Sequence, residues 1–146
     1  MEYKVDVYGD VQNAGTQYGA DLRNSAGKHI TFHESVTNQE APSIYRTHEI
    51  YLNLTPEGSM DKTVLEASAC GTLVLVTNTS FTGILPDICI AKSDSVEDIV
   101  AGIERLRTLS PQEKDIYRKS LQQVVREHHS LKKLARTLQE QCMAVS

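Results

Sequence analysis

The stretch from residue 49 to residue 76 limits the possible folds of this chain more than any other. An apolar run over 49–54 is followed by a polar loop, a helical pattern over 61–70 and a second apolar run over 72–76. Gly71 ends the helical pattern, as glycine commonly does after a helix. This order predicts a βαβ unit, whose loop and helix N-terminus lie at the carboxyl edge of a parallel sheet. Ligands bind at that edge in open α/β folds.

The remainder of the chain continues the alternation of strands and helices. We expect a Rossmann-like, doubly wound parallel sheet of the α/β class, covered on both faces, with a helical C-terminal tail. No internal repeat or boundary is evident, so a single domain is expected over residues 1–146. Further strands are expected at 3–8, 29–32 and 88–91. Further helices are expected at 16–25 and 81–85, and a last one after Ser130. Three more helices are expected to follow N-cap residues, one from Asn38 to 45, one from Ser95 to 106 and one from Ser110 to 128.

Composition excludes several classes of protein. Of the 146 residues, 40% are hydrophobic and 23% are charged, which is typical of a globular protein. A net charge of −4 and few aromatic residues argue against binding of nucleic acid. No apolar run approaches the ~20 residues of a membrane span. The three cysteines lie far apart, so we expect free, mostly buried thiols in a reducing compartment. A cytoplasmic location is expected, and peripheral placement at the inner face of a membrane stays open.

The start of the helix at 61–70 offers a place for an anion. Asp61 stands at the N-cap position, and Lys62 and Thr63 begin a first turn whose amides lack partners within the helix. A phosphate there gains hydrogen bonds and the favourable end of the helix dipole. Equally, the Asp61 carboxylate can cap the helix itself without any ligand. Both interpretations stay open from local sequence.

A second carboxylate lies one turn further into this helix. Glu66 follows Thr63 by three residues, so both lie on neighbouring faces of the helix. A carboxylate here suits two adjacent hydroxyl groups, as in a ribose, whereas a solvated helix face is the simpler explanation of a single glutamate. The chain has no Asp-x-Asp pair, and its histidines lack the spacing of a zinc site, so no metal is expected.

A family resemblance rests on the same region. The run Thr55–Gly71, with the strand 73–76 after it, resembles the C-terminal donor-binding domain of GT-B glycosyltransferases of family 4, the glycosyl transferases of group 1. The segments 5–10, 30–36 and 38–45 fit the same domain, as the turn before the donor pocket, the loop that borders the base and the helix that leads into the motif. The resemblance covers roughly residues 3–138.

The resemblance implies a role for each matched residue. Glu66 would accept hydrogen bonds from the ribose, the backbone of 62–64 would meet the diphosphate, and 57–60 would approach the donor sugar. The reaction would transfer a sugar from a nucleotide-sugar to an acceptor hydroxyl, with retention and without a metal or other cofactor. Glu57 is the implied catalytic residue. The implied donor-binding residues are Gly9, Val36, Gly58, Ser59, Met60, Asp61, Lys62, Thr63, Val64 and Glu66.

The chain departs from the family pattern in two ways. Glu57 and Glu66 have one more residue between them than the family has, so Gly58 occupies the register of the first glutamate. The acceptor-binding N-terminal lobe and the first strand of the donor lobe are missing, so we expect a fragment that is inactive alone and self-associates. Two alternatives stay open: a GT-B sugar-nucleotide epimerase lobe, and a non-catalytic α/β scaffold or dimerisation module.

Overall fold

The computed structural model describes residues 3–9, 15–55, 58, 60–129, 133, 135, 139 and 140. The chain divides into two compact units, residues 1–41 and 42–146. Each unit contains its own two-stranded parallel sheet. The sequence predicts one domain over residues 1–146, and that stays a prediction.

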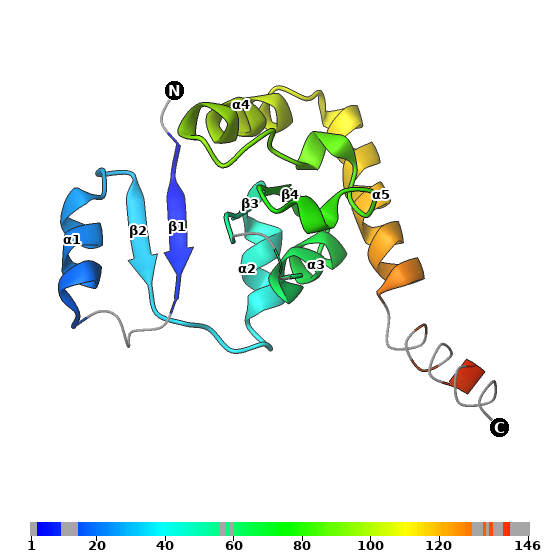
Figure 1. The fold of residues 1–146 in the computed structure, drawn as a ribbon, viewed down its shortest axis with the longest axis horizontal. Helices are drawn as coiled ribbons and strands as arrows, with labels where there is room; N and C mark the ends of the chain where they lie inside the picture. The colour runs from blue at the N-terminus through cyan, green and yellow to red at the C-terminus, as the bar shows by residue number, and fades with distance from the viewer. Residues whose placement is uncertain are drawn as a thin grey trace. The chain divides into compact units, whose positions relative to one another are not determined.

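The first unit consists of β1 (Val5–Tyr8), α1 (Gln17–Ser25) and β2 (Ile30–His33). The two strands pair in parallel along all four residues, and α1 is the crossover between them, as Figure 1 shows. Thr16 caps α1, because its hydroxyl oxygen accepts a hydrogen bond from the Gly19 amide at 3.1 Å. These three elements confirm the predicted strand, helix and strand of this segment.

The second unit starts with α2, a helix that begins at the boundary between the two units. Its elements are α2 (Ala41–Thr47), β3 (Ile50–Asn53), α3 (Lys62–Ala69), β4 (Leu73–Val76), the 3₁₀ helices η2 (Thr79–Phe81) and η3 (Asp87–Cys89), α4 (Val96–Arg107) and α5 (Pro111–His128). The strands β3 and β4 pair in parallel, with α3 as their crossover, so the predicted βαβ unit is confirmed.

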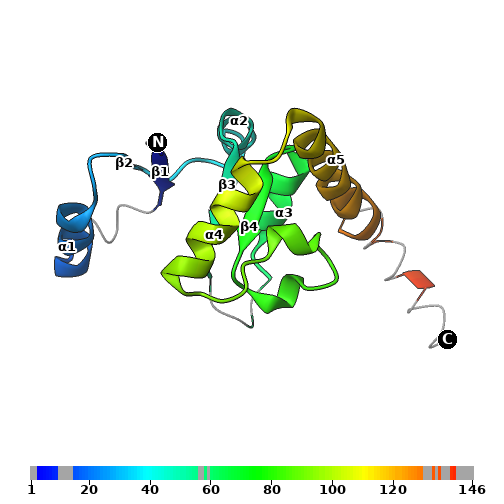
Figure 2. The ribbon, with the colours of Figure 1, turned by 90° about the horizontal axis from the view of Figure 1, so that it is seen from above.

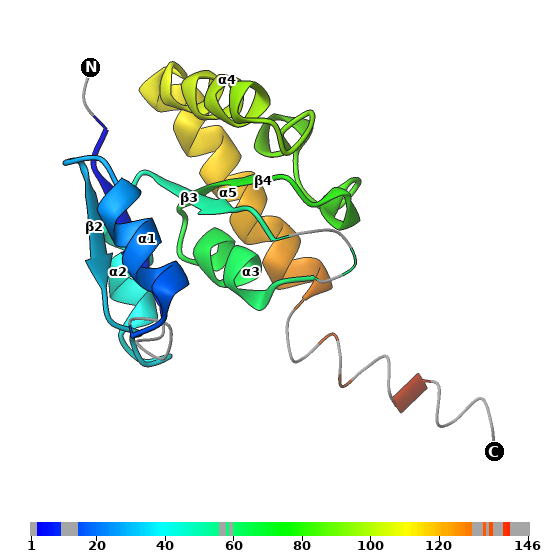
Figure 3. The same ribbon diagram turned by 60° about the vertical axis from the view of Figure 1, so that its left-hand side comes forward.

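Helices cover both faces of the β3–β4 sheet. All four residues of β4 are buried. On one face, Val74 packs in a core with Val64 of α3 and Leu121 of α5; on the other, Leu75 packs with Leu106 of α4. Figures 2 and 3 show α3 and α4 on opposite sides of this sheet. The predicted α/β class, with parallel strands and helices on two faces, is therefore confirmed.

Two short elements after β4 differ from the sequence prediction. The helix expected at 81–85 is wrong: η2 ends at Phe81, and a turn follows. The strand expected at 88–91 is also wrong, because η3 occupies its first half and a single parallel bridge joins Val76 to Ile90. The Arg105 guanidinium donates to the carbonyl oxygens of Ile88 at 2.8 Å and Ile90 at 2.9 Å. An arginine side chain thus satisfies carbonyls that a neighbouring strand would otherwise pair.

The helix caps were predicted correctly for α4 and α5 but not for α2. Ser95 and Ser110 cap α4 and α5, and Ser110 forms a capping box with Glu113. The cap predicted at Asn38 is wrong, since α2 begins only at Ala41. The capping pattern lies one residue earlier, where Thr37 and Glu40 exchange hydrogen bonds. The helix expected after Ser130 lies outside the described residues.

The described cysteines are free thiols, as predicted. Cys89 is fully buried and Cys70 is half-buried, while Cys142 lies outside the described residues. Burial raises the pKa of the Cys89 thiol to about 12, although the Val74 backbone and Arg105 oppose the shift. Among the described residues, no helix is both long enough and apolar enough to cross a membrane.

Candidate functional site

The candidate site lies where β3 ends and α3 begins. Because β3 and β4 are parallel and α3 connects them, the N-terminus of α3 lies at the carboxyl edge of this sheet (Figure 3). Open α/β folds bind ligands at that edge. The structure therefore brings together the described residues of the predicted motif from Met60 to Glu66.

Asp61 organises this edge of the sheet. Its Oδ1 accepts hydrogen bonds from the Thr63 amide at 3.0 Å and from the Thr63 hydroxyl at 2.8 Å. Its Oδ2 accepts from Asn53 Nδ2 at 2.8 Å and lies 3.5 Å from the Thr55 hydroxyl. Burial on its own would raise the pKa of Asp61, but the hydrogen bonds from Thr63, Asn53 and Thr55 outweigh it and lower the pKa. Asp61 is therefore a charged cap that ties α3 to the end of β3.

A tyrosine extends this network into the sheet. The hydroxyl oxygens of Tyr51 and Thr63 lie 2.6 Å apart. Since the single Thr63 hydroxyl proton is directed to Asp61, Tyr51 donates and Thr63 accepts. Tyr51, Thr63 and Asp61 thus form a chain of hydrogen bonds that runs toward the Asp61 carboxylate.

The Asp61 cap limits where an anion can bind. The Thr63 amide donates to the Asp61 carboxylate, and the Val64 amide donates to the Asp61 carbonyl at 3.2 Å. Two amides that were expected to meet a diphosphate are therefore engaged within the chain. Lys62 is exposed beside them, and its ammonium group is the cation at the start of α3. Coulombic attraction to the Lys62 ammonium group is one interaction that this end of the helix still offers a phosphate.

Glu66 lies one turn further along α3 and is exposed. The Tyr45 hydroxyl of α2 donates to Glu66 Oε2 at 3.4 Å. Burial raises the pKa of Tyr45 strongly, and the neighbouring Tyr51 and Glu66 raise it further. The phenol accordingly keeps its proton and stays a donor, and Glu66 offers the remainder of its carboxylate to solvent or a ligand.

The other predicted residues of this loop have distinct environments. Gly58 is exposed and has a φ of 96°, in the left-handed region that favours glycine. Met60 is 44% exposed, so its side chain is available for contact. Val64 is fully buried, so only its backbone can take part in binding. Glu57 and Ser59 lie outside the described residues, and their roles stay predictions.

Gly9 and Val36 belong to the first unit. Both are exposed, and they follow β1 and β2 at the carboxyl edge of that unit's sheet. Beside them, His33 Nε2 lies 2.5 Å from Asp6 Oδ1, and the His33 ring stacks on Tyr8 with 4.5 Å between ring centroids. Sequence reasoning did not predict this histidine–carboxylate pair, which joins neighbouring strands.

Three residues of the site were missed by sequence reasoning: Asn53, Tyr51 and Tyr45. For Asn53 the sequence contained an indication, because an asparagine at the end of a buried strand needs hydrogen-bond partners, and the loop brings the Asp61 carboxylate back to the strand. The sequence contained no comparable indication that Tyr45 would contact Glu66. They lie 21 residues apart, and the fold of the second unit brings them together.

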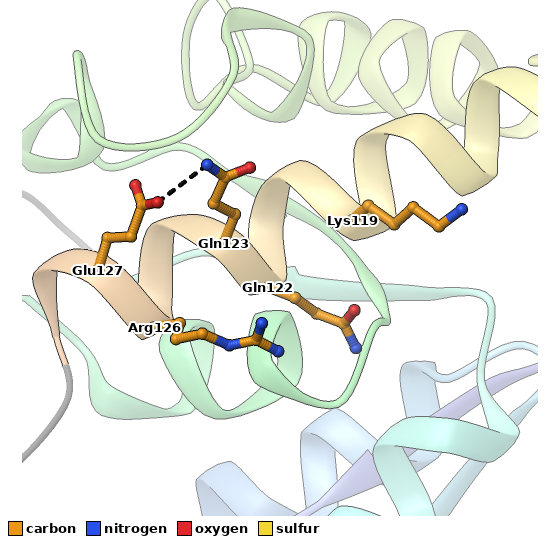
Figure 4. A pocket seen from close by; sticks show the side chains of 5 residues that line it. All are labelled: Lys119, Gln122, Gln123, Arg126 and Glu127. Carbon is orange, nitrogen blue, oxygen red and sulfur yellow. Dashed lines mark hydrogen bonds between the residues drawn. The ribbon is translucent and has the colours of Figure 1, made fainter.

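The described part of the chain contains no metal cluster at this site, and a surface hollow lies elsewhere. No group of three or more His, Cys, Asp or Glu side chains is placed there to hold a metal ion. Figure 4 shows a hollow on the surface of α5, whose described lining residues are Lys119, Gln122, Gln123, Arg126 and Glu127. Gln122 donates to the carbonyl of Ala69, at the opposite end of α3 from Asp61, so this hollow is separate from the site.

Parallel strands joined by a crossover helix, with helices on both faces of the β3–β4 sheet, define a protein of the α/β class. The chain belongs to the glycosyl transferase-like family, whose model matches residues 1–140. This confirms the resemblance to glycosyltransferases of group 1 and indicates a transferase that acts in glycosyl transfer. Searches among curated proteins and among solved structures gave no significant match.

Proposed function

We propose that this chain is the donor-binding lobe of a retaining GT-B glycosyltransferase, which transfers a sugar from a nucleotide-sugar to an acceptor hydroxyl. Membership of the glycosyl transferase-like family supports the reaction class. The observation that carries the donor assignment is the exposed Glu66 carboxylate at the carboxyl edge of the β3–β4 sheet, one turn from the N-terminus of α3.

The proposed nucleotide contacts divide between charge and hydrogen bonding. Glu66 accepts hydrogen bonds from the ribose hydroxyls, since an ionised carboxylate has acceptor positions for two of them. Lys62 attracts the diphosphate and neutralises part of its charge without a bound metal. The loop at Gly58 and Met60, with Glu57 and Ser59, faces the sugar. An acceptor-binding lobe completes the cleft, because transfer requires donor and acceptor to be held together.

One observation favours a different function. The Asp61 carboxylate occupies the place at the start of α3 where a phosphate would gain hydrogen bonds, and its charge repels an anion there. A non-catalytic scaffold or dimerisation module needs no open helix N-terminus. Nucleotide binding distinguishes the two functions, because a donor-binding lobe binds nucleotides and a scaffold does not.

Isothermal titration of the chain with UDP, GDP and ADP tests the donor assignment. We expect at least one of these to bind, and Glu66→Gln to weaken that binding by about ten- to a hundredfold, the cost of losing hydrogen bonds to a charged acceptor. Glu97→Gln is the matched control, since Glu97 is an exposed glutamate in the first turn of α4. No binding of any of the three nucleotides would support the scaffold. Binding with equal affinities for the two variants would show that the nucleotide does not contact Glu66 and would contradict the donor assignment.

A further inference from the structure

Tyr45 is held firmly on both its backbone and its ring. Its carbonyl oxygen accepts a hydrogen bond from the Thr72 hydroxyl at 2.6 Å. Its ring meets the Tyr51 ring edge to face, with 5.5 Å between centroids and an angle of 90° between planes. Since the ring also packs against the buried core around β4, the hydroxyl projects from a fixed position.

Among the described residues, the Tyr45 hydroxyl is the hydrogen-bond partner of the Glu66 carboxylate. Glu66 is exposed, and its Oε2 lies 3.4 Å from the Tyr45 hydroxyl. This separation exceeds the usual 2.5–3.0 Å of a hydroxyl–oxygen hydrogen bond. It is therefore a long hydrogen bond, whose effect on Glu66 is to bias the orientation of its carboxylate. A donor on Oε2 leaves Oε1 and the second lone pair of Oε2 available to a ligand.

We propose that Tyr45 is a positioning residue, whose hydroxyl orients the Glu66 carboxylate toward the ribose and so sets the preference for ribonucleotides over 2′-deoxyribonucleotides. The proposal rests on the proposed function, since it takes Glu66 as the acceptor of the ribose hydroxyls. Tyr45 belongs to α2 and lies outside the motif at 57–71, yet its hydroxyl determines how well the motif recognises the ribose of the nucleotide.

The physical argument concerns orientation. A free glutamate side chain samples several rotamers, and ordering it on binding costs free energy. A carboxylate already oriented by Tyr45 can accept from two adjacent hydroxyls at once, whereas a wrongly oriented one accepts from a single hydroxyl. Loss of the Tyr45 hydroxyl should therefore weaken binding of the ribonucleotide more than binding of its 2′-deoxy counterpart.

The test compares each of UDP, GDP and ADP with its 2′-deoxy form by isothermal titration. We expect the wild-type chain to prefer the ribonucleotide by about tenfold or more, and Tyr45→Phe to reduce this preference by about three- to tenfold. Tyr45→Phe keeps the ring contact with Tyr51 and removes one oxygen atom. In a Glu66→Gln background, Tyr45→Phe should change the preference no further, which is the result of a double-mutant cycle on coupled residues.

Two further variants separate positioning from a merely structural role. Tyr117→Phe removes a hydroxyl from another tyrosine that packs against the same core, and should leave the ribose preference unchanged. Glu66→Asp keeps the charge but withdraws the carboxylate by one methylene, and should lower the preference to the level of Tyr45→Phe. If Glu66→Gln abolishes the preference while Tyr45→Phe retains it in full, the positioning role is wrong and the donor site stands. If no nucleotide binds, or Glu66→Gln has no effect, both proposals are wrong.

Discussion

Replacement of Asp61 by alanine should destabilise the second unit by more than the loss of an ordinary helix cap. In the folded chain one carboxylate oxygen caps α3 through the Thr63 amide, and the other accepts from Asn53 Nδ2 at 2.8 Å. Asn53 is only 5% exposed, so its donor has little access to water when Asp61 is removed. The variant therefore loses a cap and leaves a buried polar group without its partner.

The expected magnitude is the sum of these two effects. Loss of an N-cap side chain costs about 1 kcal/mol. A buried donor left unsatisfied costs about 1–3 kcal/mol more. We expect Asp61→Ala to lower the free energy of unfolding by about 2–4 kcal/mol, a large part of the ~5–15 kcal/mol that stabilises a typical domain. Urea unfolding followed by circular dichroism measures this difference.

Ser95→Ala is the matched control for this prediction. The Ser95 hydroxyl caps α4 by accepting from the Asp98 amide at 3.2 Å, and among the described residues no buried amide side chain depends on it. We expect this variant to cost only about 1 kcal/mol. The reasoning is refuted if Asp61→Ala is no more destabilising than Ser95→Ala, because the bond between Asp61 and Asn53 would then contribute nothing to stability.

The pH dependence of the same variants gives a second check. Hydrogen bonds lower the pKa of Asp61 in the folded chain below its value in the unfolded chain. Ionised Asp61 therefore contributes stability that is present above the unfolded pKa of about 3.9 and is lost as the pH falls through the lower folded pKa. The difference between wild type and Asp61→Ala should be largest near neutral pH and should shrink on acidification, while that of Ser95→Ala stays nearly constant.

Three other outcomes follow from the packing of the second unit. Gly102→Ala should destabilise the chain by about 1 kcal/mol in thermal unfolding. The added methyl group would lie 2.8 Å from the buried Leu75 side chain, and the resulting strain exceeds the gain in helix propensity. A stabilised variant would contradict this. Cys89, buried and with a pKa raised to about 12, should react with a thiol reagent at pH 8 only when the chain unfolds, and fast native-state labelling at this position would show that it is accessible. The exposed apolar side chains of Val96 and Val100 on α4 favour self-association, and a monomer throughout a sedimentation series at high concentration would argue against it.

Local features of the second unit were predictable from the sequence because they depend on neighbouring residues. The Asp61 cap, the capping box at Ser110 and the glycine stop at Gly71 involve residues a few positions apart, and Gly71 has the left-handed φ of 79° expected of such a stop. The apolar run that forms β4 predicted a strand buried on both faces, and all four of its residues are buried.

The features that escaped prediction depend on residues far apart in the chain. Arg105 satisfies the carbonyls of residues 88 and 90, so an apolar run that resembles a strand forms a 3₁₀ helix instead. Tyr45 of α2 meets Glu66 of α3 although 21 residues separate them in the sequence, and no spacing pattern encodes that contact.

The central claim is that nucleotides bind at the start of α3, and an NMR titration tests it most directly. Addition of the nucleoside diphosphate that binds best, followed in a ¹H–¹⁵N correlation spectrum, should shift the amide signals of Lys62, Thr63 and Glu66. The amides from Lys119 to Glu127, which surround the hollow on α5, should keep their positions. Shifts confined to α5, or no shifts at saturating nucleotide, would contradict the assignment of the donor site to α3.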